Sequence, residues 1–98
     1  MTLNQVVVTG VICFQPKVKQ LGAISAASAQ LDIGARHGDV QLYALAESAT
    51  LLAALRPGQS VKIAGKLSIS PNGLLQVRVE DVVLLETRYK QIETGENA

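Results

Sequence analysis

Residues 48–55 read SATLLAAL, and this short stretch, rich in alanine and leucine, decides how the rest of the chain is interpreted. Its composition predicts a helix, and Ser48 is a suitable N-cap for it. Leu51, Leu52 and Leu55 share one side of that helix, and the Pro-Gly pair at 57–58 ends it. We therefore expect one helix that covers a core with its leucine side.

Three strands and a short polar segment are predicted on the N-terminal side of this helix. Residues 5–14, QVVVTGVICF, are β-branched and apolar, and Gly10 predicts the bulge or sharp bend by which a strand turns a barrel corner. Residues 27–33 alternate apolar and polar side chains, and residues 40–45 follow a turn as their hairpin partner. Residues 17–22, between the first two strands, are expected to form a short polar excursion.

Two more strands are predicted on the C-terminal side. Residues 61–69 and 75–85 flank a Pro-Asn-Gly sequence at 71–73, which is typical of a hairpin turn. From the alternation along the two strands we expect these side chains to face the core: Val61, Ile63, Leu67, Ile69, Leu75, Val77 and Val79. The side chains between them, Lys62, Lys66 and Arg78 among them, are expected to face outward.

The predicted order is three strands, one helix and two strands. This is the order of the OB-fold, a small, partly open Greek-key barrel. We therefore predict an all-β chain that forms a five-stranded OB-fold Greek-key barrel with one α-helix between strands 3 and 4. Residues 1–86 would form this OB-fold domain, and residues 87–98 a short, polar and disordered tail.

Composition excludes several classes of protein. A chain of 98 residues has room for one domain, and 48% hydrophobic with 17% charged residues is not the composition of a disordered chain. No apolar run approaches the ~20 residues of a membrane-spanning helix, so we expect no membrane association. The single cysteine, Cys13, cannot form an internal disulfide, which predicts a cytoplasmic protein. The net charge of +1 does not by itself indicate nucleic acid.

The sequence offers little for catalysis. His37 and Asp39 flank a turn glycine and have no nucleophile near them in the sequence. We find no phosphate-binding glycine loop, cluster of metal ligands or pair of carboxylates spaced for acid–base chemistry. Cys13 has no neighbouring base that would lower its pKa. We therefore expect no enzymatic activity, cofactor or metal.

The first strand and its continuation follow the pattern Asn4-x-Val6-x-x-x-Gly10-x-Ile12-x-x-x-Pro16-x-Val18-Lys19. In this pattern the chain resembles the bacterial single-stranded DNA-binding protein family. Further matches are Ala29-x-Leu31-x-Ile33 and residues 56–67, RPGQSVKIAGKL. The resemblance covers residues 4–86 and implies an OB-fold, single-stranded DNA as the ligand and assembly into a homodimer or homotetramer.

The chain also departs from that family, whose members stack bases on several tryptophans and phenylalanines. This sequence has no tryptophan, one phenylalanine and two tyrosines, and only Tyr43 lies near an expected stacking position. In its short length the chain is more similar to the primosomal replication protein N type. That type binds DNA largely through lysines in the loop between its last two strands. Here that loop, residues 70–73, carries no charge.

Cations and one aromatic residue are the candidates for contact with nucleic acid. The full set is Lys17, Lys19, Arg36, Tyr43, Lys62, Lys66 and Arg78. The alternative is that the charges only keep an apolar barrel in solution and that Tyr43 is an ordinary half-buried strand residue. Phe14, at the end of a strand, is either a stacking residue or packing at the rim.

Two valines predict self-association. If Val6, Val8 and Ile12 fill the barrel, Val7 and Val11 lie on the opposite face, where exposed valines favour pairing with another chain. The leading hypothesis is a non-enzymatic, homo-oligomeric protein that binds single-stranded DNA with little sequence preference in replication, repair or recombination. The alternative is an OB-fold module for protein–protein interaction that has lost nucleic-acid binding.

Overall fold

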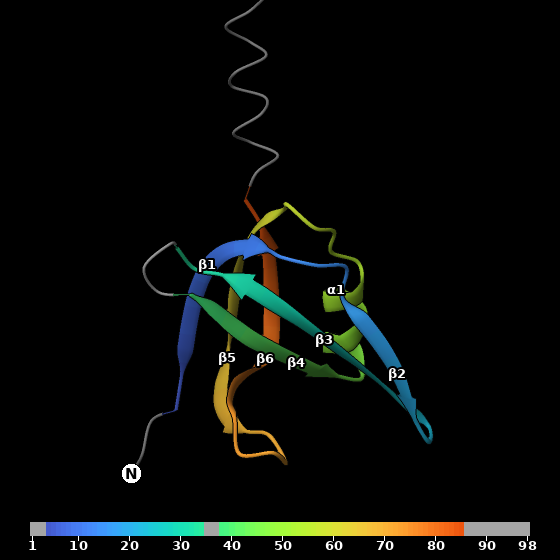
Figure 1. The fold of residues 1–98 in the computed structure, drawn as a ribbon. Helices are drawn as coiled ribbons and strands as arrows, with labels where there is room; N and C mark the ends of the chain where they lie inside the picture. Colours follow the sequence, from blue (N-terminus) through green and yellow to red (C-terminus); the bar gives the residue numbers. More distant parts are fainter. Residues whose placement is uncertain (1–3, 35–37, 86–98) are drawn as a thin grey trace, which may run out of the picture.

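Seven elements follow one another in the computed structural model, which describes residues 4–34 and 38–85 (Figure 1). They are β1 (Val6–Ile12), β2 (Lys17–Leu21), β3 (Ile24–Asp32), β4 (Asp39–Leu45), α1 (Glu47–Ala53), β5 (Ser60–Ile69) and β6 (Leu75–Leu84). The strands form one sheet in the order β1-β5-β6-β4-β3-β2, and β1 also pairs with β3. This additional pairing closes the sheet into a barrel, while β2, among the described residues, pairs with β3 alone.

The barrel closes where β1 passes Gly10. Residues Val6 to Val11 pair with β5, and the strand then pairs with β3 at Val11 and Ile12. A Cβ atom on Gly10 would collide with the carbonyl oxygen of Asp32 and stand 2.9 Å from Cγ of Leu31. The predicted corner is therefore confirmed, but it is made by close approach of two backbones, with no break in the register of β1 and β5.

Side chains from the strands and the helix fill the barrel. The alternation predicted for residues 27–33 is confirmed, since Ala27, Ala29 and Leu31 are buried. The largest fully buried side chains are Ile12, Leu31, Leu42, Leu52, Ile63, Val61 and Val77. Because every strand except β2 contributes to this core, the outer face of the sheet is held on a rigid support.

A bulge in β6 changes which residues of the strand face the core, from odd-numbered positions before it to even-numbered positions after it. Val77 and Val79 are buried, and then the register with β5 shifts between Ala64 and Gly65. The extra residue lets Glu80 and Asp81 both face solvent, after which Val82 packs against the core again. The predicted inward positions of Val77 and Val79 are thus confirmed.

The strand count predicted from the sequence is wrong, since the sheet has six strands rather than five. The predicted polar excursion at 17–22 contains β2, which pairs with β3 from Lys17↔Ser28 to Leu21↔Ile24. All five side chains of β2 are exposed, so no apolar alternation marks it in the sequence. The sequence feature that could have indicated β2 is Gly22, which has a φ of 62° in the two-residue turn at 22–23 between β2 and β3.

The helix also differs from its prediction. With the extra strand counted, α1 lies between β4 and β5 rather than between strands 3 and 4. Ser48 is not its N-cap, because the helix starts after Ala46, which has a φ of 56° and makes no side-chain cap hydrogen bond. Leu51 is 45% exposed, while Leu52 and Leu55 are buried.

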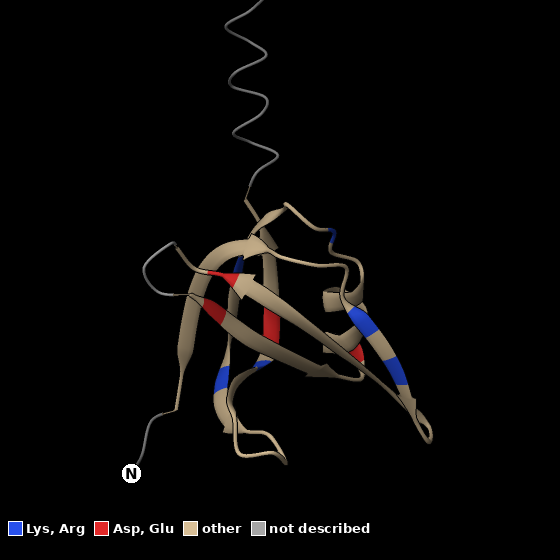
Figure 2. Ribbon diagram, in the orientation of Figure 1, with Lys and Arg blue, Asp and Glu red and all other residues tan. Residues whose placement is uncertain are grey.

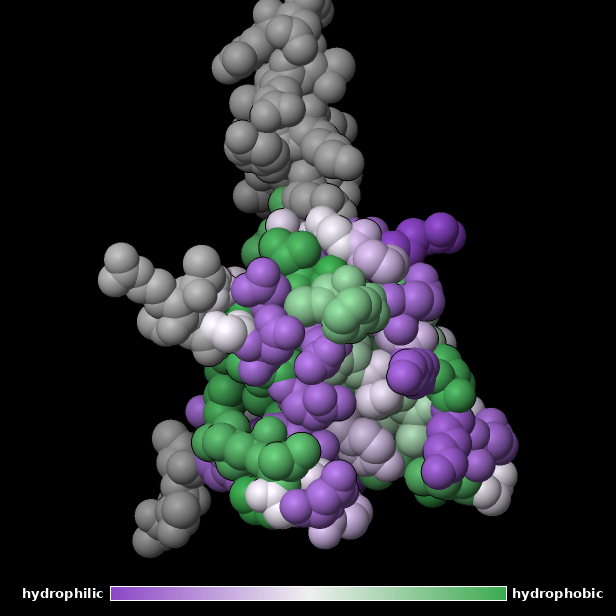
Figure 3. Space-filling view, in the orientation of Figure 1, coloured by the Kyte–Doolittle hydropathy of each residue, from purple (hydrophilic) through white to green (hydrophobic). Residues whose placement is uncertain are grey.

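The outer end of the β5–β6 hairpin extends past the core. Ser70 and Leu74 close the predicted turn through two hydrogen bonds, and Gly73 donates its N–H to the Ser70 carbonyl. Leu67, Ile69 and Leu75 were predicted to face the core but are 43%, 64% and 61% exposed. They are exposed because the hairpin extends beyond the helix and the opposing strands, and Figure 3 shows apolar side chains gathered over this end.

Several predictions fall on residues that the structure does not describe. Arg36 and His37 lie between the two described ranges, and the predicted tail, residues 87–98, lies after them. Within residues 4–34 and 38–85, no helix is long and apolar enough to cross a membrane. The same residues contain no group of three or more side chains that could hold a metal ion.

Candidate nucleic-acid interface

A row of side chains crosses the outer face of the sheet from β2 to β5. Residues paired across neighbouring strands project to the same face. Lys17 of β2 pairs with Ser28 of β3, and Ser28 pairs with Tyr43 of β4. Tyr43 pairs with Arg78 of β6, and Arg78 pairs with Lys66 of β5. We call these residues, which come from five strands, the cross-sheet row.

Two hollows lie along this row and share Lys17 and Ser28, so they form one groove over β3 and β4. The first has a volume of about 540 Å³ and extends to Phe14, Gln30 and Gln41. The second has a volume of about 690 Å³ and extends to Lys19, Tyr43, Pro71 and Gln76. The groove therefore begins beside Phe14, just after β1. At its other end it lies between β2 and the turn of the β5–β6 hairpin.

Basic side chains lie on both sides of Tyr43. Lys17 and Lys19 are exposed on β2, and Arg78 and Lys66 are exposed on β6 and β5, as the basic segments in Figure 2 show. Nζ of Lys66 is 3.9 Å from a carboxylate oxygen of Glu80, and both side chains are about half exposed, at 55% and 49%. Such a pair contributes little and leaves Lys66 able to bind an anion.

The two ends of the groove differ in charge. Beyond the cross-sheet row the same face of β3 and β4 presents Gln30 opposite Gln41, and then Asp32 opposite Asp39. Successive pairs along a strand are about 7 Å apart. The face thus changes from basic to uncharged to acidic, and Figure 2 shows the acidic segments where β3 ends and β4 begins.

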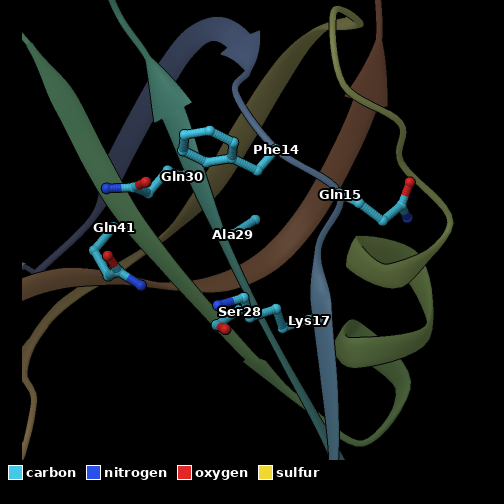
Figure 4. A pocket seen from close by; sticks show the side chains of 7 residues that line it. All are labelled: Phe14, Gln15, Lys17, Ser28, Ala29, Gln30 and Gln41. Carbon is cyan, nitrogen blue, oxygen red and sulfur yellow. The ribbon is translucent and has the colours of Figure 1, made fainter.

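Phe14 lies at the uncharged end and is 63% exposed. Its neighbours hold the chain on both sides, because the Cys13 N–H donates to the carbonyl of Gln30 at 3.0 Å and Nε2 of Gln15 donates to the carbonyl of Leu55 at 3.3 Å. Figure 4 shows the ring of Phe14 beside Gln30, with Gln15 directed away toward the helix.

Other predicted contact residues lie elsewhere. Lys62 pairs with Thr9 and Val83 and is four positions from Lys66, or about 13 Å along β5, so it does not reach the groove. Arg36 lies outside the described residues. The structure thus places three of the predicted contact residues along the groove, Lys17, Lys19 and Tyr43. Arg78 and Lys66 follow Tyr43 in the cross-sheet row but line neither hollow.

Sequence reasoning missed the amide-bearing part of the groove. Ser28, Gln30, Gln41 and Gln76 line it but were passed over as ordinary polar strand positions. The available signal was that Gln30 and Gln41 face outward at opposed positions of one predicted hairpin. Neutral amides on an alternating strand are common, so this signal points to a site only when the hollow beside it is known.

Cys13 is not an activated thiol. Burial raises its pKa, and the carboxylates of Asp39 and Asp32 raise it further. This direction agrees with the expectation that no neighbouring base activates the residue.

The fold is similar to those of several bacterial proteins. The single-stranded DNA binding protein from Thermus aquaticus matches 85% of this chain with a TM-score of 0.78 and 20% sequence identity, and the chain spans 40% of its length. The second single-stranded DNA binding protein from Mycobacterium smegmatis has a TM-score of 0.74 and 21% identity, over 87% of this chain and 91% of that one. The small single-stranded DNA-binding protein from Streptomyces coelicolor has a TM-score of 0.74 and 17% identity, over 90% and 98%.

No protein-family model and no curated protein matches the sequence itself. At these identities the likeness establishes the fold. The chain has the OB-fold of bacterial single-stranded DNA-binding proteins, and the resemblance seen in its sequence is confirmed at that level.

Proposed function

We propose that this chain is a non-enzymatic protein that binds single-stranded DNA with little sequence preference, in the cytoplasm, during replication, repair or recombination. The observation that carries the proposal is the cross-sheet row, in which cations flank Tyr43 along a groove. The names of the structurally similar proteins, all single-stranded DNA-binding proteins, support the same class of ligand.

The groove suits a single strand for physical reasons. Phosphates would contact Lys17 and Lys19 on one side of Tyr43 and Arg78 with Lys66 on the other, since Lys and Arg neutralise phosphate charge. A base would stack on Tyr43, and stacking tolerates every base because each has a π-face. None of these contacts requires a cofactor, and none reads a particular sequence.

The test is a fluorescence-anisotropy titration of the protein with labelled oligo(dT) at several salt concentrations. If three to four of the cations on either side of Tyr43 contact phosphates, log K should fall with log salt with a slope of roughly −2 to −3, from about 0.7 per phosphate. The absence of binding at about 20 mM salt, or a flat salt dependence, would contradict the proposal.

Tyr43→Ala should weaken oligo(dT) binding by about 1–3 kcal/mol with the salt slope unchanged, because stacking releases no counterions. The same titration measures both quantities. Tyr43→Phe, which keeps the ring, is the matched control and should bind as the unaltered protein does. An equal weakening in both variants would assign Tyr43 a role through its hydroxyl instead.

A second function is favoured by the apolar surface. Within the described residues the only aromatic side chains are Phe14 and Tyr43, while Ile69, Leu74 and Leu75 are exposed at the β5–β6 turn. An OB-fold module that acts through protein contacts would have these properties. It becomes the better account if the anisotropy titration shows no binding.

We also propose a homodimer or homotetramer assembled through β1. Val7 and Val11 are 60% and 39% exposed on its outer face. Among the described residues, Val6 to Thr9 pair with β5 only, so this half of β1 has one edge free. A second copy could pair with that edge and cover the valines.

Val7→Lys should shift such an assembly toward the monomer, because association would bury an unpaired charge. Light scattering over a range of concentrations measures the change. Val7→Thr, which keeps the β-branched shape, is the control and should remain assembled. If the unaltered protein has the mass of a 10.4 kDa monomer at high concentration, the assembly does not exist.

A further inference from the structure

We propose that the uncharged end of the groove is a pocket for one nucleobase, stacked on Phe14 and hydrogen-bonded by Gln30 and Gln41. The inference rests on the proposed function and adds a second base site to the one at Tyr43. This pocket is the hollow of about 540 Å³ that adjoins the cross-sheet row at Lys17 and Ser28. We call it the amide pocket.

The first argument is the position of the aromatic ring. Phe14 is 63% exposed and lines the hollow instead of packing into the core. Because the chain on either side of it is anchored to Gln30 and Leu55, its backbone is fixed beside β3. A ring whose backbone is already placed at the rim of a groove is a stacking platform that needs no ordering of the chain when a base arrives.

The second argument is the pair of amides. Gln30 and Gln41 are opposed on neighbouring strands and both line the hollow. Within the described part of the chain neither side chain makes a hydrogen bond to the protein, so the donors and acceptors of both are available to a ligand. Figure 4 shows both amides on the groove side of β3 and β4.

The third argument is charge, which selects a base over a phosphate. Lys17 lines the amide pocket on its basic side, and the Asp32–Asp39 pair lies about 7 Å beyond the two amides on the other side. The two exposed carboxylates disfavour a phosphate at this end. An uncharged, planar group with hydrogen-bonding edges is the ligand that fits, and in a single strand that group is the base.

The chemistry of an amide also makes the pocket tolerant of sequence. A glutamine presents one carbonyl acceptor and one NH₂ donor, and rotation of the amide exchanges their positions. Each base has a hydrogen-bond donor beside an acceptor on its Watson–Crick edge. Where the order of the two is reversed, rotation of the glutamine amide matches it. The amide pocket should therefore distinguish a base from no base more strongly than one base from another.

The experiment compares two labelled probes of equal length, oligo(dT) and an abasic deoxyribose-phosphate oligomer. Phe14→Ala should weaken oligo(dT) binding about 5- to 150-fold, which corresponds to about 1–3 kcal/mol, and leave binding of the abasic oligomer unchanged. The double variant Gln30→Ala/Gln41→Ala should act in the same direction. The salt slope should stay constant in all of them, and Phe14→Tyr should bind as the unaltered protein does. Circular dichroism checks that each variant is folded.

The outcomes separate the two proposals. If the unaltered protein binds oligo(dT) but Phe14→Ala binds it equally well, the amide pocket is overturned and the proposed function stands. An equal weakening on oligo(dT) and on the abasic oligomer would likewise overturn the pocket, because it would assign these side chains to the sugar-phosphate chain. If the unaltered protein binds neither probe, the proposed function fails and the pocket fails with it.

Discussion

Lys17→Ala combined with Arg78→Ala should lower the affinity for oligo(dT) roughly 60-fold at about 50 mM salt. The two residues lie on opposite sides of Tyr43 in the cross-sheet row, so the double variant removes a cation from each side of that residue. Each phosphate that a cation neutralises on a single strand adds about 0.7 to the salt slope, so removing one such cation lowers the affinity roughly eightfold at this salt. The slope should therefore also become shallower by about 1.4.

A double variant of equal charge supplies the control. Lys62 and Arg56 are exposed and lie outside the groove, so Lys62→Ala/Arg56→Ala changes the net charge by the same amount without touching the row. Anisotropy titrations at several salt concentrations compare the two proteins. A similar weakening in both would show that the affinity follows net charge, and the cross-sheet row would then not be the binding surface.

Gly10→Ala should destabilise the fold by about 2 kcal/mol and lower Tm by about 8–16 °C. The added Cβ would collide with the carbonyl oxygen of Asp32, and neither backbone can move away without disturbing the closure of β1 on β3. A smaller entropy loss on folding offsets at most about 1 kcal/mol of this cost. Thermal unfolding followed by circular dichroism measures the shift.

Thr9→Ala is the comparison for that experiment. Thr9 is the adjacent residue of β1 and is exposed, so its truncation should change the free energy of unfolding by no more than about 0.5 kcal/mol. If Gly10→Ala melts within a few degrees of the Thr9→Ala variant, the close approach at the barrel corner is not a constraint on stability.

The sequence predicts most of the barrel because its strands alternate. Apolar side chains with a period of two mark β3 and both strands of the final hairpin, and Gly10 marks the corner. The missed strand, β2, has five exposed side chains and is held by backbone hydrogen bonds to β3, which no side-chain pattern reports. Leu67 and Ile69 continue the alternation of β5 past the point where the core ends, so periodicity cannot tell that they are exposed.

The candidate site could be predicted only in part. Its charged members stand out, since an exposed lysine or arginine on a strand is easy to recognise. The register that places Tyr43 beside Arg78 is set by a parallel pairing of β4 with β6, which depends on how the barrel closes. Lys62 and Lys66 both face outward in the sequence pattern. Only the pairing of Lys62 with Thr9 and Val83 in the closed barrel shows that Lys62 lies away from the groove.

The parallel junction of β4 and β6 also has a consequence for kinetics. The β2–β3–β4 meander and the β5–β6 hairpin are each built from local pairings and can form early, on the microsecond scale of hairpins. Their union at Tyr43 and Arg78 joins segments that are distant along the chain, and such contacts form late. The proposed binding surface is therefore complete only when these two units have joined. A nucleic acid that spans both units would bind only the completed barrel, so it would raise the Tm with the logarithm of its concentration above the Kd.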